Sequence, residues 1–502
     1  MIHGIALGLL GLSGLLLPAL AAIGQETERE TADCWAGTIS AGRASLRLWL
    51  EVTKDSSGGM TATFDNLDLG ATGAGCVDVR LDGDRFSFTV PSMGASYTGR
   101  LSADGTRIVG TWNQGRPRPL EFIRQPKGTR PAPRPMPEPL PARPPVPIDG
   151  LKGVLDEAFA PVLEHGVLSP ATGGGITIGV LAGGRREVFA YGATRPQSIF
   201  EIGSVTKTFT ALVLAQMVER KKVTLDQPVR ELLPPGAVAK PDGPEITLLD
   251  LATQRSGLPR LPANLHAESD PSNPYAGYHE EHLLALLAKL GVARPEKQEF
   301  HYSNLGYGLL GFVLARLEGL SYEELVHRQV TGPLRLVDTS VHLSWSQRKR
   351  VIEAHNCIDQ PVPLWTFDVM AGGSALRSSA ADMLRYLDAQ LHPNSATGFD
   401  GKYPAASTLP AAIPMTHILR GDGPPEMKTG MGWLYSEQKQ AYVQDGGTGG
   451  CTAFAAFQPQ GDRAIVVLHN RQDLGVGPMS FTCRVAAHVM SLLSGQPTIP
   501  LE

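Results

Sequence analysis

The chain is poor in cysteine, has no excess of basic residues and contains almost no long apolar runs. Five cysteines in 502 residues, without a CxxC pair or a Cys/His ligand spacing, do not form a disulfide framework or a zinc site. A formal net charge of −4 gives no indication of a surface for nucleic acid. We therefore expect no metal, no other cofactor and no nucleic-acid partner.

Two common hydrolase signatures are also missing. No Gly-x-Ser-x-Gly motif follows the apolar N-terminal segment, which argues against an α/β-hydrolase nucleophile elbow. The segment His279-Glu280-Glu281-His282 has the wrong histidine spacing for a metalloprotease helix and is interpreted as a charged helix start.

The one long apolar run lies at the N-terminus, from Ile5 to Ala22, and contains the small-x-small site Ala19-Leu20-Ala21. It predicts a signal peptide over residues 1–22, with an uncleaved anchor as the alternative. No later run is long enough to span a bilayer. We expect a periplasmic or secreted protein without a membrane span in the mature chain, in which Cys34 and Cys76 could pair.

Residues 34–124 have the pattern of short strands. Leu46, Leu48, Leu50 and Val52 alternate with polar or larger residues, and Phe86 to Val90 repeats this period of two. The spacing predicts a small antiparallel sheet or barrel without a catalytic constellation. A binding or spacer role and a merely stabilising role both remain open for it.

A proline-rich linker and a larger domain follow. Residues 125–149 are rich in proline, which favours an extended, semi-rigid spacer. Residues 150–495 mix helices with strands, including hairpins expected around Gly183-Gly184 and around 458–462. Strands at both ends with helices between them predict an α+β domain whose antiparallel sheet is built from terminal strands.

The first chemical motif is Ser204-Val205-Thr206-Lys207. A serine hydroxyl needs a base to become a nucleophile, and a buried lysine with a lowered pKa can be that base. At positions i and i+3 of a helix the two side chains share a face. Ser204 would also lie at the helix N-terminus, where the macrodipole favours developing negative charge.

A second Ser-x-x-Lys copy occurs at Ser436 to Lys439, in a polar turn without a helical pattern after it. The copy at Ser204 follows strand-like residues and opens a helix that we expect to be amphipathic, with Phe209 and Met217 on its apolar side. This context favours Ser204.

Tyr302-Ser303-Asn304 precedes another apolar helix, expected over 305–317. A phenol can relay protons, and an asparagine amide can hold both a substrate carbonyl and the lysine. Taken alone, the triplet favours the alternative of a half-buried tyrosine with a helix-capping asparagine.

The third motif is the run Gln444-Asp445-Gly446-Gly447-Thr448-Gly449-Gly450 after a strand. Glycines here allow a substrate to lie close to the strand, and a free N–H can complete an oxyanion hole. A glycine-rich hairpin turn is the alternative.

The three motifs in this order resemble the serine β-lactamase and penicillin-binding-protein family, which includes class C β-lactamases, DD-peptidases and esterases. The similarity extends over about residues 150 to 495. It includes these further segments: Phe200 to Gly203, Leu225 to Val229, Ile246 to Pro259, Gly372-Gly373, Leu376 to Ser379 and Gly432-Trp433.

The resemblance implies a β-lactamase/transpeptidase-like fold, an antiparallel sheet flanked by helices with a helical subdomain. It implies that Ser204 is the nucleophile and that Lys207 and Tyr302 share the general-base and acid roles. Asn304, Gln444, Gly446 and Gly447 would contact substrate, and the backbone N–H groups of Ser204 and Gly447 would form the oxyanion hole. The expected substrate is a small molecule or a peptidoglycan peptide.

One position departs from the family pattern. Gln444 stands where the family usually carries Lys or His, and it brings no positive charge for a substrate carboxylate or for Tyr302. Lys428-Thr429-Gly430 spells a family-like triplet earlier, but in a preceding strand. The departure leaves two hypotheses open: an acyl hydrolase acting on β-lactams, D-Ala-D-Ala peptides or esters, and a slowly acylated or non-catalytic binder of penicillin or cell-wall fragments.

Overall fold

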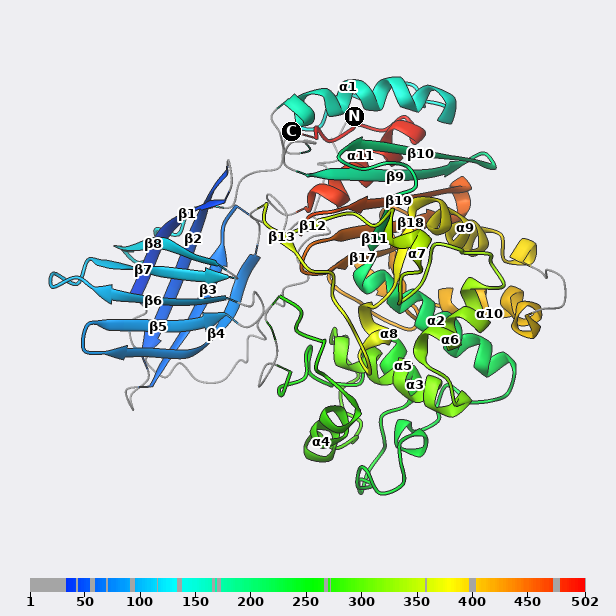
Figure 1. Cartoon of the computed structure of the whole chain (residues 1–502), viewed down its shortest axis with the longest axis horizontal. Helices are drawn as coiled ribbons and strands as arrows, with labels where there is room; N and C mark the ends of the chain where they lie inside the picture. The colour runs from blue at the N-terminus through cyan, green and yellow to red at the C-terminus, as the bar shows by residue number, and fades with distance from the viewer. Residues whose placement is uncertain are drawn as a thin grey trace, which may run out of the picture. The chain divides into compact units, whose positions relative to one another are not determined.

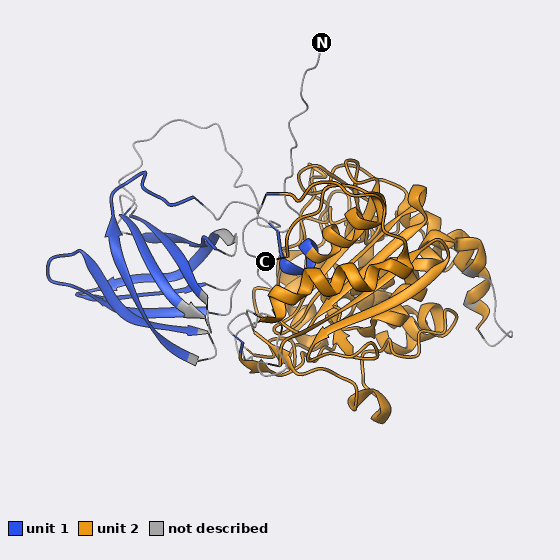
Figure 2. Cartoon of the chain, turned by 90° about the horizontal axis from the view of Figure 1, so that it is seen from above, with its two compact units in different colours: residues 1–138, 357–359, 474–484 blue, residues 139–356, 360–473, 485–502 orange. Residues whose placement is uncertain are grey.

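The computed structural model describes most of the chain. The described ranges are 33–41, 44–54, 59–68, 71–90, 95–114, 116–132, 138–164, 168, 173–265, 270, 272–356, 359–396, 403–472 and 479–501. The signal peptide expected over residues 1–22 and the cysteine at position 357 lie outside them. Two compact units are distinguished in Figure 2, one with residues 1–138, 357–359 and 474–484, the other with the remaining residues.

Strands of the first unit close into an antiparallel barrel in which each strand pairs with its neighbours in the chain and β1 pairs with β8. The strands are β1 (Asp33–Ala41), β2 (Ala44–Lys54), β3 (Met60–Asn66), β4 (Ala71–Asp82), β5 (Arg85–Val90), β6 (Ala95–Leu101), β7 (Arg107–Gln114) and β8 (Arg116–Gln125). The domain boundaries predicted from the sequence stay predictions.

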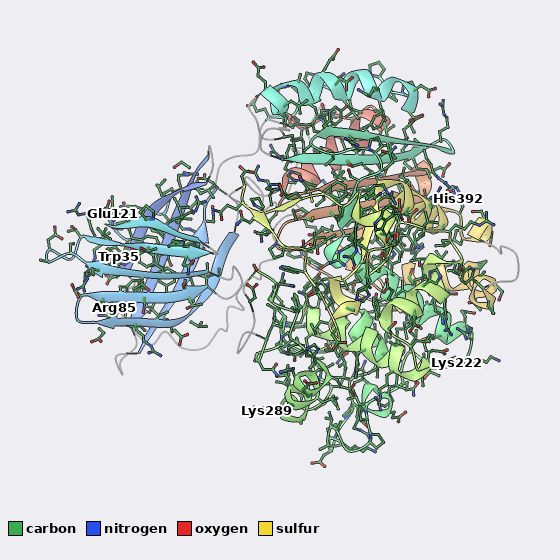
Figure 3. All side chains as sticks on the ribbon, viewed as in Figure 1. Trp35, Arg85, Glu121, Lys222, Lys289 and His392 are labelled. Carbon is green, nitrogen blue, oxygen red and sulfur yellow. The ribbon has the colours of Figure 1, made fainter. Side chains whose placement is uncertain are left out.

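The barrel interior is a packed aromatic core. The ring of Phe88 lies 5.4 Å from that of Tyr97 and 6.4 Å from that of Phe122. Trp35 belongs to the same core, whereas Arg85 and Glu121 are exposed on the barrel strands, where Figure 3 labels all three. This alternation of buried and exposed side chains is the period of two expected for half-buried strands.

The suggested pairing of Cys34 with Cys76 is wrong for this structure, because both are free thiols. Cys34 lies in β1 and Cys76 in β4, and two strands separate them around the barrel. Burial raises the pKa of the Cys76 thiol to about 12, so this thiol is unreactive at neutral pH.

The second unit is built on one antiparallel sheet with the strand order β10-β9-β19-β18-β17-β16-β15 (Figure 1). Its strands are β9 (Gly175–Ala182), β10 (Arg185–Gly192), β15 (Met427–Thr429), β16 (Leu434–Ser436), β17 (Ala441–Gly447), β18 (Thr452–Gln458) and β19 (Arg463–His469). Since β9 pairs with β19, the sheet joins the beginning and the end of this unit, as predicted.

Helices pack around this sheet, and α2, α3, α5, α6 and α8 gather in one group beside it (Figure 1). The helices are α1 (Leu151–Glu164), α2 (Thr206–Glu219), α3 (Leu248–Ala252), α4 (Glu280–Leu290), α5 (Asn304–Glu318), α6 (Tyr322–Val326), α7 (Trp345–Arg348), α8 (Ala371–Ser374), α9 (Ala380–Leu391), α10 (Leu409–His417) and α11 (Phe481–Ser494).

Helix α2 is not amphipathic, contrary to the expectation from the sequence. All of its residues from Thr206 to Met217 are buried, because α5, α8 and α10 pack against it. Its polar side chains find partners inside the protein: Thr210, for example, donates to the carbonyl of Gly372 over 2.7 Å. A fully buried helix fixes the position of the residues at its N-terminal end.

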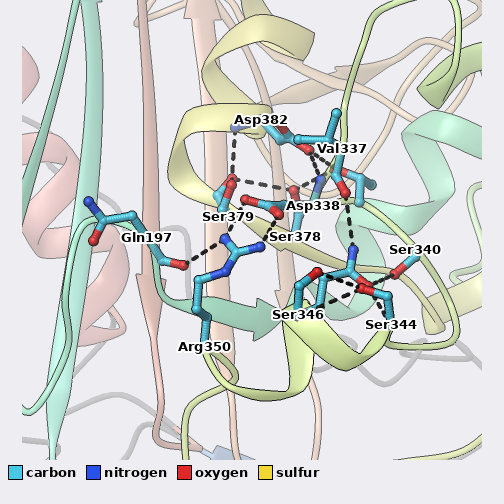
Figure 4. Close-up of polar contacts among 12 residues, drawn as sticks. Gln197, Val337, Asp338, Ser340, Ser344, Ser346, Arg350, Ser378, Ser379 and Asp382 are labelled. Atoms are coloured by element: carbon cyan, nitrogen blue, oxygen red, sulfur yellow. Dashed lines mark hydrogen bonds and ion pairs between the residues drawn. The ribbon is translucent and has the colours of Figure 1, made fainter.

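Two short strands support the N-terminal end of α2. Strand β11 (Ile199–Glu201) pairs with β14 (Arg377–Ser379), which brings together two segments more than 170 residues apart in the chain. Behind this pair, Arg350 forms two hydrogen bonds with the carboxylate of Asp338, at 2.8 and 2.5 Å, and a third with the carbonyl of Gln197 (Figure 4). Asp338 in turn donates its backbone N–H to Asp382.

Candidate active site

Ser204 lies in a 3₁₀ turn, Gly203–Val205, between strand β11 and helix α2. The turn requires glycine at position 203, where φ is +49° and a Cβ would lie 2.6 Å from the backbone nitrogen of Gly447. Ser204 is half-buried, so its hydroxyl is held by the protein and still reached by solvent.

Lys207 is buried beneath Ser204, with a 1% exposed side chain. Its Nζ lies 2.8 Å from the Oγ of Ser204, 2.8 Å from the Oδ1 of Asn304 and 2.8 Å from the carbonyl oxygen of Gly373. Burial, helped by the positive charge of Arg260, holds the pKa of Lys207 well below its usual range. A lysine in this state is available as a base at neutral pH.

Tyr302 approaches Ser204 from the other side, and its hydroxyl donates to the Ser204 Oγ over 2.7 Å. The neighbouring Ser303 holds this segment, because its N–H donates to the Gln254 side chain and its hydroxyl donates to the carbonyl of Pro259, each over 2.7 Å. Burial raises the pKa of Tyr302, and the charge of Arg260 opposes that rise.

Asn304 is the first residue of α5, and its backbone N–H donates to the carbonyl of Arg260 over 2.9 Å. Its Oδ1 and the carbonyl of Gly373 together accept hydrogen bonds from Lys207. Gly373 lies in α8, so the Gly372-Gly373 segment that carries part of the family resemblance supplies a backbone partner for the lysine.

Arg260 is a site residue that the sequence analysis missed. Its guanidinium carbon lies 5.0 Å from the centroid of the Tyr302 ring, and the Nζ of Lys207 lies at the same distance from that centroid. Arg260 directly follows the Ser256-to-Pro259 segment, but no sequence pattern distinguishes it from an ordinary surface arginine. Its exposed side chain adds a positive charge beside the tyrosine.

Strand β17 passes very close to the Gly203–Val205 turn that carries Ser204. A Cβ placed on Gly446 would lie 2.1 Å from the carbonyl oxygen of Ile202 and 2.8 Å from the backbone nitrogen of Ser204. A Cβ on Gly447, in contrast, would meet no atom within 4 Å. Gly446 therefore allows the strand to contact the turn, and Gly447 faces open space next to Ser204.

Gln444 and Asp445 point to different sides of β17. Gln444 is buried, and its amide donates to the carbonyl of Asp445 over 3.0 Å. Asp445 is half-buried on the face it shares with Gly447, since side chains two apart on a strand share a face. Burial raises the pKa of Asp445, and the charges of Lys207 and Arg260 oppose that rise. The strand thus presents a carboxylate where the sequence analysis looked for a cation.

An aromatic cluster joins the segment before α4 to the segment before α8. The ring of Tyr275 lies 5.4 Å from that of Trp365 and 4.8 Å from that of Phe367. Trp365 also lies against β17's continuation, because a Cβ on Gly449 would be 2.7 Å from its Nε1. The cluster therefore lies close to the glycine segment.

The two competing copies of the motifs lie elsewhere. Ser436 ends β16, and its Oγ accepts the backbone N–H of Lys439 in a turn. Lys428 lies in β15, two strands from β17 in the sheet, and pairs with Asp422 at 2.7 Å. Neither contacts Ser204 in the described part of the chain.

The described residues contain no group of three or more His, Cys, Asp or Glu side chains placed to hold a metal ion. Within the same residues, no helix combines the length and the apolar character that crossing a membrane requires.

The fold of the second unit is the β-lactamase/transpeptidase-like fold. A class C β-lactamase from Rhodobacter sphaeroides superposes with a TM-score of 0.52 and 24% identity, covering 63% of this chain and 93% of that structure. A β-lactamase from Sulfitobacter sp. EE-36 gives 0.55 and 23%, covering 70% and 98%. At these identities the structures define the fold alone.

The sequence defines the family. The Beta-lactamase family model matches residues 167–479, more than half of the 502 residues, so the chain belongs to the Beta-lactamase family. This is the family that the motifs predicted, and that prediction is confirmed.

Characterised relatives carry two kinds of names. The D-alanyl-D-alanine-carboxypeptidase/endopeptidase AmpH of Escherichia coli K12 is 28% identical over 314 residues, which cover 60% of this chain and 80% of AmpH. A β-lactamase of Pseudomonas fluorescens is 25% identical over 364 residues, covering 64% and 94%. The chain is a hydrolase-family protein related to both peptidases and β-lactamases.

Proposed function

We propose that this protein is an exported serine acyl hydrolase that acts through an acyl-enzyme on Ser204. One observation carries the proposal: the Ser204 Oγ lies within hydrogen-bonding distance of both the Lys207 Nζ, at 2.8 Å, and the Tyr302 hydroxyl, at 2.7 Å. A serine placed between a buried lysine and a half-buried tyrosine has a route for losing its proton and a route for passing it on.

Acylation begins with proton transfer from Ser204. In its neutral form Lys207 has two N–H groups, which match the two oxygen acceptors on Asn304 and Gly373, and one lone pair, which is left for the serine proton. The Ser204 oxygen then bonds to the substrate carbonyl carbon. The oxyanion accepts from the backbone N–H groups of Ser204 and Gly447, which lie on segments in close contact.

Collapse of the tetrahedral intermediate breaks the bond to the leaving group. Tyr302 donates its proton to the leaving atom and regains one from protonated Lys207, so the first product departs neutral. Water then attacks the acyl carbonyl, gives its proton to the same Lys207 and Tyr302 pair, and releases the acid while Ser204 recovers its hydrogen.

The substrate class follows from the relatives and from the open face of β17. β-Lactams, D-Ala-D-Ala peptides and esters all present a carbonyl that can lie along this strand, and AmpH and the β-lactamases carry the first two in their names. Export through a signal peptide would place the protein in the periplasm or outside the cell, where such substrates occur. The aromatic cluster of Tyr275, Trp365 and Phe367 would contact the acyl part.

A slowly acylated binder is the second candidate, favoured by one observation. Gln444 is buried and bonded to its own strand, so the third motif adds no cation to the site. A binder would form the acyl-enzyme and retain it.

Turnover and labelling separate the two candidates. We expect the purified protein to hydrolyse at least one of nitrocefin, a D-Ala-D-Ala peptide and a short chromogenic ester, and Ser204→Ala to lose both turnover and labelling by fluorescent penicillin. The Ser436→Ala variant is the matched control and should retain both. Stable labelling without turnover would favour the binder, and activity that survives Ser204→Ala would refute both candidates.

A further inference from the structure

A cavity of about 720 Å³ lies beside the segment that carries Tyr302. Its walls are the end of α3 and the loop after it, the segment before α5, and the loop before β15. Each of these three walls contributes one arginine: Arg255, Arg294 and Arg420.

Among the described residues, a carboxylate pairs with only one of these arginines. Arg294 pairs with the buried carboxylate of Asp250 at 2.7 Å. Arg255 donates to the backbone carbonyls of Thr253 and Asp422 instead. The side chain of Asp422 is 87% exposed and pairs with Lys428 at 2.7 Å.

Of the three arginines, Arg420 has the fewest described partners for its side chain. Its Nε is buried and has no hydrogen-bond partner among the described residues, and the Nε of Arg294 is in the same state. Burial lowers the pKa of Arg420 without an acidic group to offset it, and burial also lowers the pKa of Arg255. Buried donors of this kind are costly unless a partner satisfies them.

The backbone is shaped to admit these guanidinium groups. Gly421 has a φ of +127°, and a Cβ there would lie 2.8 Å from a terminal nitrogen of Arg255. Glycine at this position therefore lets Arg255 enter the cavity wall. The acidic lining residues are Asp250, Asp422 and the exposed Glu299. Because Asp250 pairs with Arg294 and Asp422 pairs with Lys428, Glu299 is left against the two charges of Arg255 and Arg420, and the cavity keeps a net positive charge.

We propose that this cavity is a binding site for a small oxyanion, a phosphate or a carboxylate group, held by Arg255 and Arg420. Planar guanidinium groups bind both anions through paired N–H donors, and the unbonded Nε of Arg420 leaves one such donor for an anion. The site is separate from the acyl-transfer reaction and does not depend on it.

The cavity borders the residues that position the tyrosine. Gln254, between the lining residues Thr253 and Arg255, accepts the backbone N–H groups of His301 and Ser303 over 2.7 Å each. A bound anion would therefore stabilise the loop on which the Tyr302 segment is held, and we expect it to raise the unfolding temperature.

Titration calorimetry with the full chain tests the site, with inorganic phosphate and citrate as separate probes at constant ionic strength. We expect saturable binding of at least one of them, which also tells a phosphate site from a carboxylate site. Arg420→Gln and Arg255→Gln should each weaken binding about tenfold or more, as expected for the loss of a charge-assisted hydrogen bond.

Two controls keep the test specific. Arg328→Gln removes an exposed arginine of the segment His327–Thr331 and should bind as the parent does, and Arg260→Gln should also retain binding because Arg260 belongs to the active site. Unfolding temperatures without anion show whether each variant is folded. Absence of saturable binding with both probes, or binding lost with Arg260→Gln but kept with Arg420→Gln, would overturn the proposal.

Discussion

The guanidinium carbon of Arg260 lies 5.0 Å from the ring centroid of Tyr302, and this places a positive charge beside the hydroxyl that contacts Ser204. The sequence suggested that the site lacks a cation, because Gln444 stands in the third motif. The structure provides one from a different loop, where its charge lowers the pKa values of both Lys207 and Tyr302.

The first prediction concerns this charge. In Arg260→Gln the pKa of Lys207 should rise, so the lysine becomes neutral only at higher pH. The acid limb of the kcat/KM profile should move to higher pH, and activity at neutral pH should fall on the order of tenfold, the effect of one partly screened unit charge near the lysine. Arg260→Lys should restore most of the profile, and an unchanged profile in Arg260→Gln would contradict the assignment.

Asp445 should act with the opposite sign. Its carboxylate raises the pKa of Lys207, so Asp445→Asn should move the acid limb to lower pH. The same substitution removes negative charge from the open face of β17 and should lower KM for substrates that bear a carboxylate. A pH–rate series with a neutral ester and a carboxylate-bearing cephalosporin measures both effects, and a shift to higher pH would refute the placement of Asp445.

The two residues on either side of Ser204 should be needed for the chemical step. Lys207→Met and Tyr302→Phe should each lower kcat by about 10²–10⁴, the usual contribution of acid–base groups. Tyr307→Phe is a matched control for the tyrosine, because its hydroxyl donates to the carbonyl of Ala252 rather than to Ser204. Pre-steady-state ester hydrolysis locates the defect, and a loss confined to KM would argue against these roles.

Alanine substitutions at the two adjacent glycines of β17 should differ in their effect on the stability of the protein. Alanine at 446 forces a Cβ against the Ile202 carbonyl, so Gly446→Ala should lower the unfolding temperature and lower kcat by disturbing the oxyanion donors, about 10²–10³ for one lost donor. Gly447→Ala should leave stability unchanged, because its Cβ meets open space. Thermal unfolding of both variants makes the comparison, and equal destabilisation would show that the close approach is not as described.

Introducing a positive charge at position 444 tests the remaining departure from the family. Gln444→Lys should raise activity on carboxylate-bearing substrates, with Gln444→Met as the neutral control. The effect of Gln444→Lys depends on whether the lysine side chain can reach the substrate side from the buried face of β17 on which Gln444 lies. Steady-state kinetics on nitrocefin and a neutral ester decide this, and no change on either would mean that the missing cation is not what limits the enzyme.

Local patterns in the sequence were enough to predict much of this architecture. The two predicted hairpins of the sheet and the helix after Tyr302 appear where alternation and turn residues indicated them, as β9–β10, β18–β19 and α5. The four polar residues Ser204, Lys207, Tyr302 and Asn304 also meet as their motifs suggested.

The rest depended on long-range packing that no local pattern encodes. Helix α2 was expected to have a polar face, but neighbouring helices surround it and its threonines bond to them. Arg260 and Asp445 gain their importance only when the loop of Arg260 and strand β17 meet at Ser204. The carbonyl of Gly373 is a backbone atom, which sequence reasoning about side chains does not consider.

The pairing of β9 with β19 has a consequence for how the protein folds. Gly175 donates to the side chain of Asn470, 295 positions later, so the central sheet closes only when nearly the whole unit has been synthesised. Such distant contacts make folding slow. Ser204 is thus made more than 200 residues before the glycines of β17 that contact its turn, and a nascent or truncated chain would carry Ser204 without them.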